Sequence, residues 1–198
     1  MRSTRTVIYA VLTLVAAAGM CAFIAIHFSV TAWLPLAVLA ILTLVSENFA
    51  FELPVKGSVS LSFAMVYAAL LLDGPLAGVV CAIAGAMTLE EVRSRVPMSA
   101  RVFNFGQLIL SAGAAGLAYL AAGGQELAAA EWPTAINLPA ALAAALAFYT
   151  ANVTLVTTYM AAKTGLSFLD MLRKQGFLAY AASLVVLGLL GLMIAVLL

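Results

Sequence analysis

The chain has 198 residues, of which 66% are hydrophobic and 9% are charged, with a formal net charge of +1. A soluble domain of this size could not keep so much apolar surface from water, so lipid must solvate most of its exterior. The small net charge excludes the broad basic surface that nucleic-acid binding requires. We therefore expect one integral membrane domain covering residues 1–198.

Apolar segments follow one another along the chain, and a spanning helix needs about 20 such residues. The second segment is short, so its helix is expected to continue through Phe49 and to carry Glu47 to the edge of the hydrocarbon. The third and fourth are also short and form either two spans or a re-entrant helical hairpin. The sequence thus predicts an all-α polytopic bundle with about seven spans. In chain order the segments are Val7–Phe28, Trp33–Val45, Val59–Leu72, Pro75–Leu89, Val102–Ala122, Leu138–Ala162 and Phe177–Leu198.

Charge placement predicts the orientation of this bundle. With a cytoplasmic N-terminus, all nine Lys and Arg residues fall on the inner side. Two of them belong to the amphipathic stretch Leu166–Lys174, which should rest on the membrane surface. The outer side keeps only the acidic residues Asp73, Glu126 and Glu131. This asymmetry is the one that the positive-inside rule requires.

Small residues recur at helical spacing in several segments and predict close helix contacts. Ala112 and Gly116 share a face of the fifth segment, and Gly188, Gly191 and Ala195 share a face of the last. In lipid, helix backbones approach each other where side chains are small. We expect all of these residues to serve helix packing.

The chain lacks the residue patterns of common catalytic and metal sites. His27 is the sole histidine, and Cys21 and Cys81 both fall inside apolar runs, where packing roles are expected. Phosphate loops, nucleophile elbows and paired catalytic carboxylates are not found in the sequence. We expect neither an enzyme nor a bound metal or cofactor.

A sparse set of polar side chains inside or beside the apolar segments remains as the candidate site. Asn104 and Gln107 fall on one helical face, and Asn152 and Tyr149 share a face of the sixth segment. An unpaired amide in hydrocarbon costs several kcal/mol, so these groups should face the interior. They either join helices through hydrogen bonds, each worth about 0.6 kcal/mol, or line a ligand cavity. The candidate ligand-binding residues are Glu47, Ser60, Asn104, Gln107, Tyr149 and Asn152.

Several short motifs resemble a known family. They are Ser46-Glu47, Leu53-Pro54, Val59-Ser60-Leu61-Ser62-Phe63, Gly74-Pro75, Phe103-Asn104-Phe105-Gly106-Gln107-Leu108 and Ala151-Asn152-Val153-Thr154-Leu155. Together they resemble the N-terminal multi-span domain of bacterial HD-GYP and GGDEF cyclic-di-GMP signalling proteins. The resemblance implies a sensor in the bacterial cytoplasmic (inner) membrane that passes a conformational bias to an output domain. The chain contains no HD-GYP or GGDEF catalytic segment, so it is either a stand-alone relative or an excised membrane domain.

A second likeness concerns residues 59–85, which are similar to S components of energy-coupling factor vitamin importers. Those proteins place the preceding segment outside, whereas the basic residues place it inside here. The sequence therefore predicts a membrane module that recognises a small or lipid-like molecule, with membrane lipids and an output domain as partners. The alternatives are a vitamin-uptake subunit with an energising partner subunit, and a structural scaffold.

Overall fold

The computed structural model describes residues 2–48, 51–53, 57–59, 61–86, 96–127, 137–174 and 177–198. It confirms the predicted all-α bundle and adds one short antiparallel hairpin, in which Phe51 pairs with Val59. The elements in chain order are α1 (Arg2–His27), α2 (Trp33–Asn48), β1 (Phe51–Leu53), β2 (Gly57–Val59), α3 (Ser62–Gly85), α5 (Met98–Ala121), α6 (Leu138–Thr164), α7 (Phe168–Lys174) and α8 (Phe177–Leu197).

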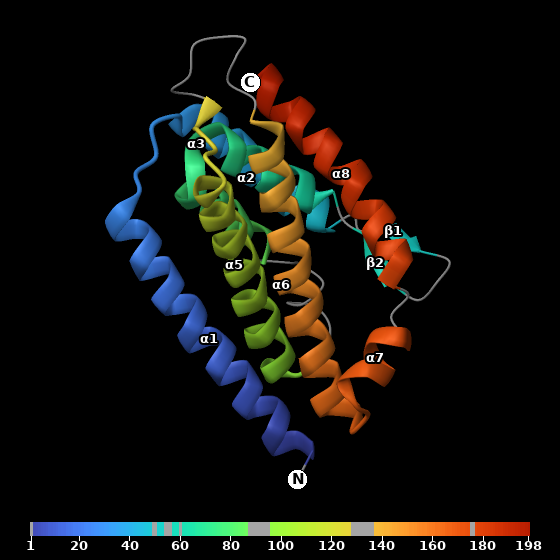
Figure 1. Cartoon of the computed structure of the whole chain (residues 1–198). Helices are drawn as coiled ribbons and strands as arrows, with labels where there is room; N and C mark the ends of the chain where they lie inside the picture. The colour runs from blue at the N-terminus through green and yellow to red at the C-terminus, as the bar shows by residue number, and fades with distance from the viewer. Residues whose placement is uncertain are drawn as a thin grey trace.

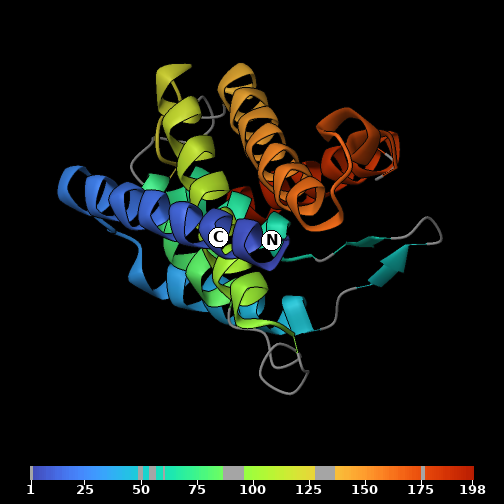
Figure 2. The same cartoon turned by 90° about the horizontal axis from the view of Figure 1, so that it is seen from below.

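The helices surround α3, which packs against α2, α5 and α8. Helices α1, α5 and α6 run along the length of the bundle, whereas α2 and α3 occupy the half opposite the N-terminus (Figure 1). The two chain termini lie at opposite ends of the molecule (Figure 1). The β1–β2 hairpin projects from the side of the bundle, as the view from below shows (Figure 2).

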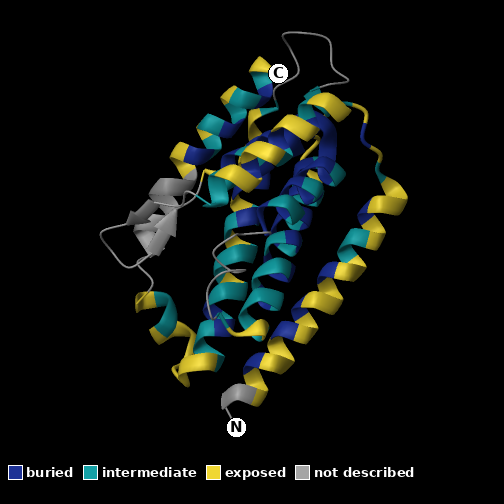
Figure 3. Ribbon diagram, turned by 180° about the vertical axis from the view of Figure 1, so that it is seen from behind, coloured by how far each residue is buried: buried dark blue, intermediate teal, exposed yellow. Residues whose placement is uncertain are grey.

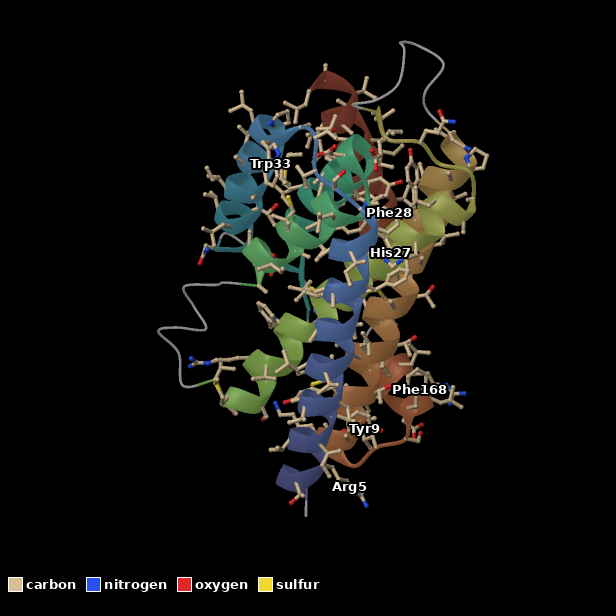
Figure 4. All side chains as sticks on the ribbon, turned by 90° about the vertical axis from the view of Figure 1, so that its left-hand side faces the viewer. Arg5, Tyr9, His27, Phe28, Trp33 and Phe168 are labelled. Atoms are coloured by element: carbon tan, nitrogen blue, oxygen red, sulfur yellow. The ribbon has the colours of Figure 1, made fainter. Side chains whose placement is uncertain are left out.

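The surface of the bundle is suited to lipid. Counted from end to end, four described helices, α1, α3, α5 and α6, have the length and apolar composition of membrane spans. Large apolar side chains are exposed along the outer face of α1, whereas α3 is almost wholly buried (Figure 3). Tyr9 lies near Arg5 at one end and Trp33 lies at the other (Figure 4), which matches the aromatic belts of membrane interfaces.

Helix α3 is a hairpin rather than a straight span. Asp73 and Gly74 depart from helical geometry, with φ of −140° and 82°, and Pro75 starts the second arm. A Cβ added at Gly78 would lie 3.0 Å from the Cβ of Leu70, although residues eight apart in a straight helix are separated by about 12 Å. Each arm is about 16 Å long, too short to cross about 30 Å of hydrocarbon. Of the two predicted forms for this region, the structure has the hairpin.

Glycines permit the closest helix contacts. A Cβ at Gly116 of α5 would lie 2.7 Å from Cβ of Pro75, and one at Gly191 of α8 would lie 2.6 Å from the carbonyl oxygen of Ala64. These two positions serve packing, as the sequence predicts. Gly188 differs, because an added Cβ there would meet no atom of the described residues within 4 Å. The expectation that Gly188 serves helix packing is therefore wrong.

Candidate functional site

Three predicted amides form a hydrogen-bonded chain between α5 and α6. Gln107 is buried, and its Oε1 accepts from Nδ2 of Asn152 at 3.0 Å. Its Nε2 donates to Oδ1 of Asn104 at 3.2 Å, and Ser111 donates its hydroxyl to the Gln107 carbonyl at 2.8 Å. These polar groups satisfy one another inside the apolar bundle, which is the arrangement expected of a helix–helix link.

The other predicted site residues lie elsewhere or outside the described part of the chain. Glu47 is half-buried near the end of α2, a helix that packs against α3. Tyr149 is half-buried on α6, three residues before Asn152. Ser60 lies outside the described residues. The structure thus brings together Asn104, Gln107 and Asn152 and places Glu47 on a different helix pair.

A buried carboxylate at the tip of the α3 hairpin holds the start of α2. Asp73 is 1% exposed, and its Oδ2 accepts from the backbone amides of Thr31 at 2.9 Å and Ala32 at 3.0 Å. Its Oδ1 accepts from the Thr31 hydroxyl at 2.5 Å. These amides immediately precede α2, so Asp73 acts as a cap supplied by another helix and complements the positive end of the helix dipole.

The loop after α5 covers this hairpin tip. Tyr119 donates its hydroxyl to the Gln125 carbonyl at 2.7 Å, which folds the loop back over the end of α5. Glu126 consequently lies over Gly74, where its Oε1 occupies the space that a Cβ would need. Burial raises the pKa of the Glu126 carboxyl, and the nearby charge of Asp73 raises this pKa further.

A ligand-sized apolar groove of about 460 Å³ lies between α6 and α8. Its volume falls within the range of about 300–1,000 Å³ that is typical of ligand pockets. The two helices lie side by side but contact each other sparsely, because α8 packs mainly on α3 (Figure 1). We call this space the α6–α8 groove. Its lining residues are Tyr67, Leu138, Pro139, Ala141, Leu142, Ala145, Leu146, Val185, Gly188, Leu189 and Leu192.

The floor of the groove is buried and its rims are exposed. Tyr67, Ala141 and Ala145 are at most 8% exposed, whereas Leu142 on α6 and Leu189 on α8 are each 60% exposed. The Tyr67 hydroxyl donates to the Ala141 carbonyl at 2.5 Å and thereby ties α3 to α6 beneath the groove. Every other lining side chain is apolar. The α6–α8 groove is therefore suited to holding an apolar molecule.

Sequence reasoning missed both the Asp73 cap and the α6–α8 groove. An ionisable residue within an apolar stretch of 24 residues is a recognised signal, because such a residue is costly without partners. The charge asymmetry predicts only that Asp73 lies on the outer side and gives it no partner. The groove has no comparable signal, since its residues are ordinary leucines, alanines and valines. It arises from how α8 is placed.

Comparisons of the chain with protein-family models, curated proteins and solved structures found no match. The described residues contain no group of three or more His, Cys, Asp or Glu side chains that could hold a metal ion. The candidate sites are thus the α6–α8 groove and the amide link between α5 and α6.

Proposed function

We propose that this protein is a non-enzymatic membrane module that binds a small or lipid-like molecule in the α6–α8 groove. The observation that supports this proposal is the groove itself, with its volume of about 460 Å³ and its apolar lining. Ligand pockets in helical bundles commonly lie between helices and are lined mostly by apolar side chains, as this groove is. The amide link, in which Asn152 donates to Gln107, then serves to hold α5 and α6 together.

The resemblance to signalling domains supplies the cellular role in this proposal. Ligand binding would bias the arrangement of the helices and pass that bias to an output domain. A ligand shifts such an equilibrium only through its different affinities for the two states. Such a bias would act through α8, which forms one wall of the groove and packs on α3.

A vitamin-uptake subunit is the second candidate, and the shape of α3 favours it. Discontinuous helices that stop within the hydrocarbon build the binding sites of many transporters. The break at Asp73 and Gly74 makes α3 such a helix. In this role the protein would require an energising partner subunit, and uptake in cells would depend on an ATPase.

Native mass spectrometry of the gently solubilised protein tests the binding proposal. We expect an additional mass on the wild-type chain, lost in Leu142→Trp, which fills the groove from its α6 rim. Val186→Trp is the matched control, because Val186 is 65% exposed on α8 and does not line the groove. A chain that carries no additional mass in all three forms, in mild detergent and in nanodiscs, would refute the proposal and favour a scaffold.

The proposal includes a location in the bacterial inner membrane with a cytoplasmic N-terminus. Arg5 and α7, which ends in Arg173 and Lys174, lie at the same end of the bundle (Figures 1 and 4). A cysteine replacing exposed Lys174 should resist an impermeant thiol reagent in intact cells, whereas one replacing exposed Gln125 should react. Both variants are made with Cys21 and Cys81 changed to serine. Reaction at position 174 alone would reverse the orientation.

A further inference from the structure

We infer that the α6–α8 groove takes a single hydrocarbon chain of a membrane lipid, which enters sideways from the bilayer between the two helices. This inference rests on the proposed ligand-binding function and names the chemical class of the ligand.

The lining of the groove selects against polar solutes. The Tyr67 hydroxyl is its one side-chain hydrogen-bond donor, and that proton already goes to the Ala141 carbonyl. A vitamin-like molecule carries several donors and acceptors, and the groove would leave most of them unpaired. Unpaired polar groups are unfavourable in apolar surroundings. A hydrocarbon chain has no such requirement and can contact the leucine and alanine side chains along its length.

The groove is open toward the lipid rather than enclosed. Its rims carry Leu142 and Leu146 on α6 and Val185 and Leu189 on α8, all of which are 52–63% exposed. In a bilayer, side chains exposed on the outside of two spanning helices face lipid chains. A ligand therefore needs no aqueous path to reach the floor at Tyr67, and a lipid chain is already present at the opening.

Gly188 keeps the α8 wall of the groove clear. One helical turn away, Gly191 is pressed against the backbone of Ala64 and has no room for a side chain. Within the described part of the chain, nothing lies within 4 Å of a Cβ added at Gly188, so close helix packing does not explain a glycine at this position. Because Gly188 lines the groove, a larger residue there would occupy space that is open now.

The inference is tested by photolabelling in proteoliposomes. The probe is phosphatidylcholine with a diazirine near the end of one acyl chain, present at a few per cent of total lipid. Cross-linked residues are then mapped by mass spectrometry. We expect labelling on the groove residues Tyr67, Ala145 and Leu142 to exceed labelling on the lipid-facing residues Leu12 and Val15 of α1 at least three-fold. Leu12 and Val15 are 61% and 64% exposed and report ordinary contact with bulk lipid.

Two groove-filling variants separate a bound chain from bulk lipid. Gly188→Trp and Leu142→Trp should each lower labelling of Tyr67 and Ala145 at least three-fold while labelling of Leu12 stays unchanged. Val186→Trp, outside the groove, should change neither. Thermal unfolding in detergent shows that each variant is folded, and the two fillers act from different helices, so failure of one to fold leaves the other.

The outcomes distinguish this inference from the function on which it rests. Equal labelling of the groove and of α1, unaffected by the fillers, means bulk lipid only and overturns the inference. A retained polar molecule in native mass spectra, lost with Leu142→Trp, also overturns it but keeps the ligand-binding function. Protection of Tyr67 through self-association, lost when the protein is diluted to monomers, assigns the groove to a second copy and overturns it as well.

Discussion

Among the buried interactions described above, we expect the Asp73 cap to give the largest loss of stability when one residue is replaced. Its two carboxylate oxygens accept from three donors, the Thr31 amide, the Thr31 hydroxyl and the Ala32 amide. Asp73→Ala leaves these donors without their acceptor and creates a small cavity at the hairpin tip. We expect α2 to lose its anchor to α3 at this point.

The loss of unfolding free energy in Asp73→Ala can be estimated from the exposure of each donor. Thr31 is exposed, so water can replace the carboxylate at its two donors, which leaves about 0.5–1 kcal/mol of loss for each. The amide of half-buried Ala32 is harder to hydrate and contributes about 1–2 kcal/mol. The total for Asp73→Ala is about 3 kcal/mol, above the usual range of about 0.5–2 kcal/mol for a lost cap. Asp73→Asn keeps the shape and one acceptor oxygen and should lose about half as much.

The free energy of unfolding is measured by titrating the protein in mild detergent with a denaturing detergent and following helicity. Thr31→Val is the matched control, because it removes only the hydroxyl bond to Asp73 and should cost about 1 kcal/mol. The double variant with Asp73→Ala should then cost no more than Asp73→Ala alone. A loss below about 0.5 kcal/mol for Asp73→Ala would refute the view that this carboxylate anchors α2.

Three further predictions concern other contacts. The native state raises the pKa of Glu126 above its ordinary 4.5, so the free energy of unfolding of the wild type should fall as pH rises from 4.5 through that raised pKa. Glu126→Gln should remove this pH dependence when unfolding is measured at a series of pH values. Gly116→Leu should cost at least about 1–3 kcal/mol by overpacking against the hairpin proline, whereas Gly19→Leu, with nothing within 4 Å, should be neutral or stabilising. Asn152→Leu should cost about 0.6 kcal/mol in the same titration, because it removes the bond to Gln107, and should leave ligand retention unchanged.

The parts of the fold that depend on residue type and local spacing could be predicted from the sequence. Apolar segments of sufficient length give helices in a membrane, because the backbone must satisfy its own hydrogen bonds there. The amides at Asn104 and Gln107 fall on one helical face by spacing alone, and the structure confirms that they meet Asn152. The Asp-Gly-Pro break between two short segments likewise indicated a turn, although spacing left open whether it joined two spans or two arms.

The remaining features depend on distances between segments far apart in the chain. Asp73 finds its donors 41 and 42 residues earlier, at the link between α1 and α2. Gly188 and Gly191 look alike in sequence, yet one faces the groove and the other faces the backbone of α3. The difference arises because α8 packs on α3 and leaves its side toward α6 sparsely contacted. The local sequence pattern does not indicate which side of α8 packs on α3.

The first arm of α3 links the cap to the floor of the groove. Tyr67 lies within this arm and Asp73 lies at the break that ends it, and each bonds to a different part of the bundle. An arm fixed at Ala141 of α6 and at the start of α2 cannot shift toward the groove without breaking one of these bonds. The floor of the groove is therefore preformed, and only the exposed rims on α6 and α8 can adjust to a ligand. Loosening the distant cap with Asp73→Asn should consequently weaken ligand retention in native mass spectra. Thr31→Val, which keeps both amide bonds, should weaken it less.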